Sequence, residues 1–259
     1  MRLPTLAALV AALAMPICAS SAEISAAPNG IHIDGQIVKG DARKLALLLT
    51  DSIEHDDHYR LFLFGVRLNS PGGDVEEAMK IARLVEQAFT STSVSGGGSC
   101  ASACFLIWAA GVERHIDSHD RLGVHRLSLA ATSVDIRRAE RAIAPATQSI
   151  EAFLLAAGIP RLVIQKMNET PSSDIFWVTP GWLIQEGIGI AIGERPAFLD
   201  VAEKACGINP YYSALRAHKE LDLAEGKRWT FCGRRVRKEN QQMHRDEIMQ
   251  ALTDARTAQ

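Results

Sequence analysis

Ser102 stands where a serine side chain can do chemistry. The glycine-rich turn Ser95–Ser99 leads towards it, and the apolar run Phe105–Ala110 follows it. This pattern predicts a tight turn that delivers Ser102 to the first turn of a buried helix, which ends at Gly111. A serine there either caps the helix through its side-chain oxygen or acts as a nucleophile, because free N–H groups and the helix dipole favour a developing oxyanion.

Acyl transfer by a serine also needs a base, an orienting acid and an oxyanion hole, and the sequence offers a candidate for each. His125 ends a predicted strand, and Asp174 precedes a hydrophobic turn. Gly73 ends the turn Asn69–Gly73, whose two glycines and proline allow a close backbone approach. The alternatives are that His125 is a core histidine and that Asp174 is an ordinary turn residue.

Alternating strands and helices must position these residues. We expect strands at 30–37, 61–68, 92–94, 114–116, 122–126 and 188–192, and helices at 42–49, 74–89, 133–157, 161–169 and 181–186. Pro145 should kink the third of these helices or divide it in two. The alternation indicates parallel βαβ units, whose sites gather at the carboxyl ends of strands. Residues 23–29 are expected to form an unstructured lead.

The composition is globular, with 47% hydrophobic and 22% charged residues in a chain of 259, and it permits one sizeable core with an appendage. A net charge of −2 gives no case for binding to nucleic acid. Residues 1–22 are typical of a signal peptide, with a short positive start, an apolar stretch too short to span a membrane, and small residues before Glu23. We therefore expect a soluble protein exported to a bacterial periplasm, without stable membrane insertion. Cys18 offers a lipoprotein signal as the less favoured alternative.

Four cysteines remain after residue 22, and an even number indicates disulfides in an oxidising compartment. We expect Cys206 to pair with Cys232, because both lie in the same C-terminal segment. Cys100 and Cys104 flank Ser102, and helical geometry at this spacing rarely suits a bridge. Their state is left open between a bridge and two small buried thiols.

The composition and pattern of the sequence change near residue 198 and divide the chain into two parts. Residues 23–197 hold the alternating strands and helices, and residues 198–259 form a smaller C-terminal extension with a polar, helix-prone tail. The extension carries a basic run at 227–238, which we interpret as a solvated surface, with contact to an anionic partner as the alternative. His55 and His58 fall in a polar loop that we also interpret as solvated, so neither a metal nor another cofactor is expected.

Several segments match a known family in order and spacing: Leu68–Gly73, Cys100–Ala103, Leu122–His125, and Asp174–Thr179 followed by Glu186–Ile188. They resemble the Clp protease proteolytic subunit and its relatives in the ClpP/crotonase superfamily, over roughly residues 60–192. The resemblance implies an α/β fold of repeated ββα and βαβ units. The small cysteine-containing C-terminal extension would be an addition to that fold.

The resemblance further implies a serine peptidase that acts on peptides or unfolded protein segments. Ser102 would be the nucleophile, and His125 would be the general base and then the general acid to the leaving amine. Asp174 would hold the imidazole in its working tautomer.

The same resemblance gives roles to the backbone around the serine. The N–H groups of Gly73 and Ala103 would form the oxyanion hole. Ser70, Pro71 and Gly72 would line the strand along which a peptide docks through main-chain hydrogen bonds.

Two features depart from the family and keep other functions open. Cytosolic members form large rings with an ATPase, but a periplasm has no ATP to supply one, so we expect no ATPase partner and at most a smaller homo-oligomer. One alternative is a protein of this fold that binds peptides without cutting them, which the cysteines beside Ser102 favour. The other is a crotonase-type acyl-thioester enzyme, which rests on fold analogy alone.

Overall fold

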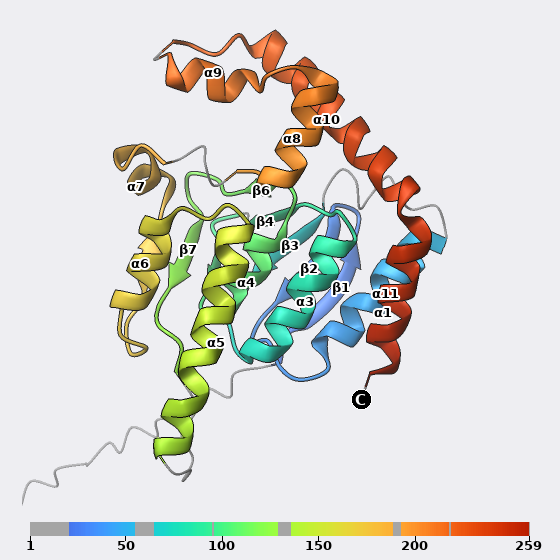
Figure 1. The fold of residues 1–259 in the computed structure, drawn as a ribbon. Coiled ribbons are helices and arrows are strands. Elements are labelled where there is room, and N and C mark those ends of the chain that lie inside the picture. The colour runs from blue at the N-terminus through green and yellow to red at the C-terminus, as the bar shows by residue number, and fades with distance from the viewer. Residues whose placement is uncertain are drawn as a thin grey trace, which may run out of the picture.

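A computed structural model describes most of the chain, and the residues it covers are 21–54, 65–94, 96–128, 136–188, 193–217 and 219–258. A five-stranded sheet in the order β1-β2-β3-β4-β6 forms its centre (Figure 1). Its strands are β1 (Glu23–Ala27), β2 (Gly30–Asp34), β3 (Val66–Asn69), β4 (Thr92–Val94) and β6 (Arg114–His115). All neighbours from β2 to β6 are parallel, so the predicted α/β class is confirmed.

Strand β1 corrects the expectation of an unstructured lead. It pairs antiparallel with β2, with Ile24 opposite Ile33 and Ala27 opposite Gly30. The turn between the strands ends at Gly30, whose φ of 125° is open to glycine but strained for other residues. Of the expected signal peptide, residues 1–20 lie outside the described ranges, and Ala22 donates a hydrogen bond to the carbonyl of Gln36 at 2.6 Å.

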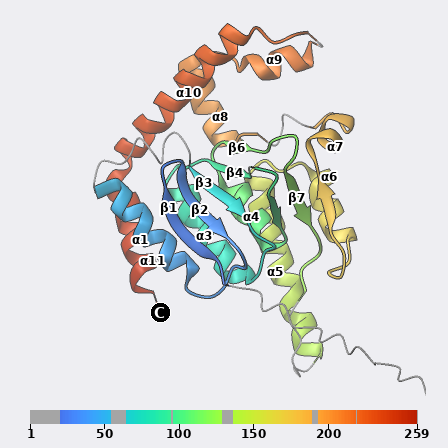
Figure 2. The same ribbon diagram turned by 180° about the vertical axis from the view of Figure 1, so that it is seen from behind.

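Helices connect the parallel strands and cover one face of the sheet. Helix α1 (Asp41–Glu54) follows β2, and α3 (Val75–Gln87) joins β3 to β4. Asp74 begins α3 by accepting the N–H of Glu77 at 2.8 Å. Seen from behind in Figure 2, the strands lie in front of α3 and α4, so the helices line the opposite face.

Helix α4 (Ala103–Ala110) occupies the interior of the molecule, and all eight of its residues are buried. It packs against α3, β4 and β5. Because its whole surface is apolar, it can exist only in such a fully covered position. Gly111 ends it, as the sequence predicts.

A second sheet of three strands lies beside the first, in the order β5-β7-β8. Strand β5 (Ser99–Ala101) runs parallel to β7 (Arg121–Val124), and β8 (Phe176–Val178) runs antiparallel to β7. The two sheets meet where Ser70 pairs with Cys100. This junction brings the end of β3 next to the end of β5.

Three helices lie beside the second sheet and α4. Helix α5 (Ile136–Ala156) packs against α4, α6 (Arg161–Glu169) packs against α5 and β8, and α7 (Pro180–Gln185) places Trp182 against Phe176 of β8. Helix α5 runs through Pro145 without a break, so the expected division into two helices is wrong. Its buried residues Ile150 and Leu154 lie in the main core, and this packing maintains a helix that proline alone would weaken. The expected last strand at 188–192 falls mostly outside the described residues.

The C-terminal extension consists of α8 (Pro196–Cys206), α9 (Pro210–Arg216), α10 (Leu223–Met243) and α11 (Arg245–Thr257). Helix α10 passes from the top of Figure 1 down to the body of the molecule, where α11 packs against α1 and α3. Ile248 and Leu252 of α11 are buried in the main core. The polar tail of the sequence is therefore an amphipathic helix with one face in the core.

A disulfide joins two helices of the extension, and an ion pair attaches the extension to the rest of the molecule. Cys206 and Cys232, which the sequence pairs, form a disulfide between α8 and α10. Arg237 of the basic run is buried and donates to the carboxylate of Glu113. The interpretation of that run as a solvated surface is therefore wrong for Arg237. Within the described ranges, no helix combines the length and apolar composition needed to cross a membrane.

Candidate active site

Ser102 adopts an unusual backbone conformation between β5 and α4. Its φ of 56° and ψ of −126° are rare for any residue other than glycine and cost about 1–3 kcal/mol. Its N–H donates to the carbonyl of Gly123 at 2.8 Å, which fixes the residue against β7. Its side chain makes no capping hydrogen bond, so the helix-cap interpretation is wrong.

Gly72 makes room for Ser102. Its φ is 100°, and a Cβ at this position would lie 2.7 Å from the Cβ of Ser102 and 2.7 Å from the carbonyl oxygen of Ala101. Two heavy atoms do not approach so closely without a shift of the backbone. A glycine is therefore required for the turn after β3 to pack against the turn before α4.

The turn itself is held by Ser70, which is buried. Its hydroxyl accepts the N–H of Gly72 at 3.1 Å, and its carbonyl accepts the N–H of Ala101 at 2.9 Å. Of the three residues predicted to line a peptide strand, Ser70 and Gly72 are buried and Pro71 is exposed.

Gly73 and Ala103 carry the two backbone N–H groups that are expected to form an oxyanion hole. Ile37 donates to the carbonyl of Gly72 and accepts the N–H of Asp74, so the N–H of Gly73 between them points away from Ile37. Ala103 is the first residue of α4, where an N–H has no partner within its own helix. Both residues line the same cavity as Ser102.

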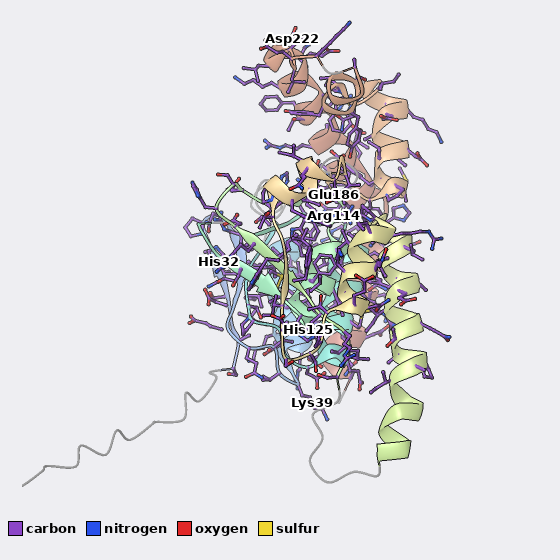
Figure 3. All side chains as sticks on the ribbon, turned by 90° about the vertical axis from the view of Figure 1, so that its left-hand side faces the viewer. His32, Lys39, Arg114, His125, Glu186 and Asp222 are labelled. Carbon is purple, nitrogen blue, oxygen red and sulfur yellow. A yellow bond between two sulfur atoms is a disulfide. The ribbon has the colours of Figure 1, made fainter. Side chains whose placement is uncertain are left out.

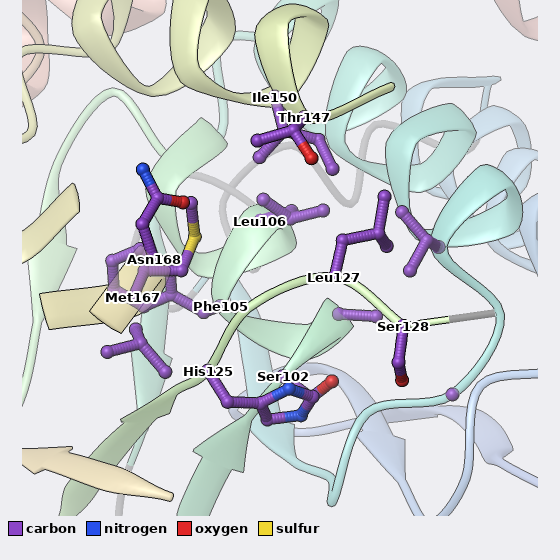
Figure 4. Close-up of a pocket in the computed structure, with 14 residues that line it drawn as sticks. Ser102, Phe105, Leu106, His125, Leu127, Ser128, Thr147, Ile150, Met167 and Asn168 are labelled. Carbon is purple, nitrogen blue, oxygen red and sulfur yellow. The ribbon is translucent and has the colours of Figure 1, made fainter. Parts of the chain in front are cut away.

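His125 follows the last residue of β7 and lines that cavity too, with its ring beside Ser102 (Figure 4). Its Nδ1 lies 2.9 Å from the carbonyl oxygen of Arg126. Because a carbonyl can only accept, this contact assigns the proton of the neutral ring to Nδ1. Nε2 is then the unprotonated atom and is able to take a proton.

Asp174 lies at the same end of the β7–β8 pair as His125, but its carboxylate contacts another group. Strands β7 and β8 pair Val124 with Phe176, so the segments that carry His125 and Asp174 leave the ladder at the same end. Asp174 is exposed, and its Oδ1 accepts the N–H of Ile175 at 2.8 Å. In the described part of the chain, the carboxylate and the imidazole bond to backbone groups and not to each other.

The cavity beside Ser102 has a volume of about 100 Å³, which is the space of a few water molecules or one small side chain. Its wall is mostly apolar, and its polar residues are Ser102, His125, Ser128, Thr147 and Asn168. The residues that complete it are Val75, Phe105, Leu106, Val124, Leu127, Ser128, Thr147, Ile150, Met167 and Asn168.

Sequence reasoning did not find the part of this wall that comes from α5 and α6. Thr147 and Ile150 lie on α5, and Met167 and Asn168 lie on α6. Their spacing is that of ordinary amphipathic helices, so no local signal marks them. Only the packing of both helices against the second sheet and α4 brings them to the cavity.

Cys100 and Cys104 form a disulfide, which corrects the view that their spacing rarely suits a bridge. That view assumed that both residues are helical. Cys100 instead lies in β5, and the turn at Ser102 brings its Cα to 5.2 Å from that of Cys104. Among the described residues, no group of three or more His, Cys, Asp or Glu side chains is arranged to hold a metal, and His55 and His58 lie outside them.

Figure 3 shows His125 in the lower half of the molecule and Asp222, which begins α10, at its top. Arg114 lies between them. It donates to the carbonyls of Ala109, Ala157 and Glu194, and burial lowers its pKa to about 9. The candidate site is therefore separated from the far end of the extension by the buried core.

Comparisons with known proteins show what this chain is similar to. A mutant of the ClpP1 protein from Listeria monocytogenes shares 21% identity, covers 62% of this chain and 88% of its own, and gives a TM-score of 0.44. A mutant of the 1510-N membrane-bound stomatin-specific protease shares 16% identity over 61% of this chain and 74% of its own, also with a TM-score of 0.44. No curated protein sequence matches significantly. The family model described as Clp protease matches residues 26–176, more than half of the sequence, and the chain therefore belongs to the Clp protease family.

Proposed function

We propose that this protein is a serine peptidase that hydrolyses peptides or unfolded protein segments, with Ser102 as its nucleophile. One observation carries the proposal. A strained, uncapped serine shares one cavity with a histidine and with two residues whose N–H groups can bind an oxyanion. Strain of this kind is retained where the surrounding structure enforces it, and it concentrates at active sites.

The proposed reaction has two halves, acylation and deacylation of Ser102, and His125 transfers a proton in each. Nε2 of His125 takes the proton of the Ser102 hydroxyl as its oxygen attacks the carbonyl carbon of the peptide. The N–H groups of Gly73 and Ala103 stabilise the oxyanion, and His125 returns the proton to the leaving amine. Water then enters, gives a proton to the same nitrogen and attacks the acyl carbon, and His125 returns that proton to the oxygen of Ser102 as the acid product leaves.

Asp174 is proposed as the acid that stabilises the imidazolium. The segment that carries Asp174 leaves the β7–β8 ladder at the same end as the segment that carries His125. In the proposed reaction, the Asp174 carboxylate exchanges its bond with the N–H of Ile175 for a bond with the Nδ1–H of His125. Until it does so, the carbonyl of Arg126 holds the proton on Nδ1.

We also propose that the protein acts in the periplasm, without an ATPase and as at most a small homo-oligomer. The signal-like segment 1–22 supports export. The two disulfides support an oxidising compartment, because such bonds are rare in reducing ones. A substrate that is already unfolded needs no ATP-driven unfolding before it reaches the cavity.

The test is labelling of the purified protein with a fluorophosphonate probe, read by intact mass. We expect one adduct on the wild type and none on Ser102→Ala or His125→Ala. Ser128→Ala is the matched control, because Ser128 lines the same cavity and has no role in the proposed reaction. An adduct that survives Ser102→Ala, or depends on Ser128, contradicts the proposal.

The position of the Asp174 carboxylate favours a second candidate, a peptide-binding protein that does not cut. Its contact with Ile175 leaves the histidine without a carboxylate partner among the residues that the structure describes. This candidate predicts that peptides bind and stay intact, and that no adduct forms between pH 6 and 9 on the wild type. A rapid, stoichiometric adduct excludes it.

A further inference from the structure

The Cys100–Cys104 disulfide encloses Ser102. The bond closes a ring of five residues with Ser102 at its centre. Cys100 belongs to β5, Cys104 belongs to α4, and both are completely buried. The strand that enters the proposed site and the helix that leaves it are thus joined covalently across the serine.

Backbone hydrogen bonds tie the strand side of this ring to neighbouring segments. Ala101 donates to the carbonyl of Ser70, and Ser102 donates to the carbonyl of Gly123. On the helix side, the bond from the N–H of Phe105 to the carbonyl of Ser102 at 3.0 Å is internal to the turn and does not tie it to β5. Helix α4 packs against β5, and the disulfide adds a covalent link between the two sides.

Rotation about two bonds of Ser102 sets the geometry of the site. Its φ of 56° directs the hydroxyl, and its ψ of −126° directs the next peptide group, which carries the N–H of Ala103. A serine without constraints leaves the left-handed region for a conformation of lower energy. A short covalent ring allows few combinations of φ and ψ, so it opposes that relaxation.

We propose that the Cys100–Cys104 disulfide positions Ser102 and the Ala103 N–H for catalysis, so that peptidase activity rises when the bond forms. The inference rests on the proposed function of Ser102. The two thiols lose two protons and two electrons to an external disulfide, which is reduced to two thiols through a mixed-disulfide intermediate. The chain would therefore be less active in a reducing compartment than in an oxidising one.

The second disulfide provides a matched control. Cys206–Cys232 joins α8 to α10 in the extension, and neither cysteine lines the cavity. Its loss removes a cross-link of the same kind without touching the serine turn.

The first experiment compares Cys100→Ala/Cys104→Ala with Cys206→Ala/Cys232→Ala and the wild type. We expect the first pair to slow fluorophosphonate labelling and to lower kcat by about tenfold or more, since small misplacements of reacting groups are costly, with KM unchanged because Pro71 and its turn are intact. The control pair should label at the wild-type rate. Thermal unfolding is measured on all three, because a purely structural bond would lower Tm and leave labelling and kcat unaltered.

The second experiment uses the wild-type chain alone, so that a variant that fails to fold cannot decide the result. The protein is unfolded in urea with dithiothreitol, which reduces both disulfides. It is then refolded in redox buffers of graded glutathione ratio and labelled with the fluorophosphonate probe. Alkylation after unfolding, followed by peptide mass analysis, gives the fraction of each disulfide. Labelling should follow the Cys100–Cys104 bond and return when glutathione disulfide restores it.

The outcomes separate the two proposals. If the reduced and oxidised chains label at the same rate while Cys100 and Cys104 become alkylated, the positioning role is overturned and the peptidase stands. If the fully oxidised wild type does not label at all, the proposed function fails, and this inference fails with it.

Discussion

At the scale of single residues, the site depends on backbone conformations that few side chains tolerate. Ser102 and Gly72 both have positive φ angles, and they face each other across the contact between two turns. The absent side chain of Gly72 is what gives the Cβ of Ser102 its space. A change at Gly72 should therefore act on the nucleophile although the glycine has no chemistry of its own.

We predict that Gly72→Ala abolishes fluorophosphonate labelling of Ser102 and lowers the free energy of unfolding by about 1–3 kcal/mol. The new Cβ would meet Ser102 and Ala101. Gly96→Ala is the control, because Gly96 has a φ of 74° but nothing within 4 Å of an added Cβ, so it should cost about 1 kcal/mol and label normally. Normal labelling of Gly72→Ala at 25 °C would show that the contact between the turns is not needed.

Asp174 is the second prediction at this scale. Asp174→Ala should slow labelling about 10- to 100-fold, less than the complete loss expected for Ser102→Ala, because the Arg126 carbonyl still keeps the proton on Nδ1. Ser173→Ala, an exposed neighbour, should label at the wild-type rate. An unchanged rate in Asp174→Ala would mean that the backbone carbonyl alone orients His125.

At the scale of elements, the chain assembles the site where strands end. The turn after β3, the turn after β5 and the residue after β7 meet at the junction of the two sheets, as expected for the carboxyl ends of parallel strands. A separate set of contacts attaches α10 to the segment before β6. The buried pair of Glu113 and Arg237 lies at its centre.

We predict that Glu113→Gln lowers the free energy of unfolding by about 1–3 kcal/mol, because it replaces the carboxylate that accepts from the buried guanidinium of Arg237 with a neutral amide. Glu169→Gln removes one partner of the exposed pair Lys166–Glu169 and should leave stability essentially unchanged. Urea denaturation followed by tryptophan fluorescence measures both. Equal midpoints for the two variants would contradict the importance assigned to the buried pair.

At the scale of the whole molecule, the extension is part of the main core. Helix α11 packs against α1 and α3 and contributes Ile248 and Leu252 to the same cluster of buried side chains as the sheet. We predict that Leu252→Ala lowers the free energy of unfolding by about 2–5 kcal/mol. The folded fraction should still label at Ser102, since α11 does not reach the cavity.

Ile184→Ala is the matched control for this prediction, because Ile184 is 73% exposed and its loss should change stability by about 0.5 kcal/mol or less. Chemical denaturation of both variants, with labelling of the native samples, provides the comparison. A stability of Leu252→Ala equal to that of Ile184→Ala would show that α11 is not a true part of the core.

Features with strong local signals could be predicted from the sequence. The helix 161–169 and the end of α4 at Gly111 follow from glycine, proline and apolar spacing. The turn at Ser102 follows from the glycines before it and the apolar run after it. The hairpin at Gly30 has a turn signal, but the segment before it is short and has mostly small side chains, so it gives little strand signal.

Features that depend on distant contacts could not be predicted. The Cys100–Cys104 bridge requires a strand and a helix on either side of a sharp turn, whereas a spacing of four alone indicates one helix. The position of the Asp174 carboxylate depends on a choice between two nearby partners that sequence cannot weigh. Met167 reaches the cavity only because α6 packs beside β8.

The contact between α1 and α11 has a consequence for biosynthesis. A ribosome produces α1 long before α11, so the part of the apolar face of α1 that α11 covers stays open until α11 has been synthesised. The described core can close fully only after that point. While synthesis lasts, the open face is a surface that a chaperone can bind.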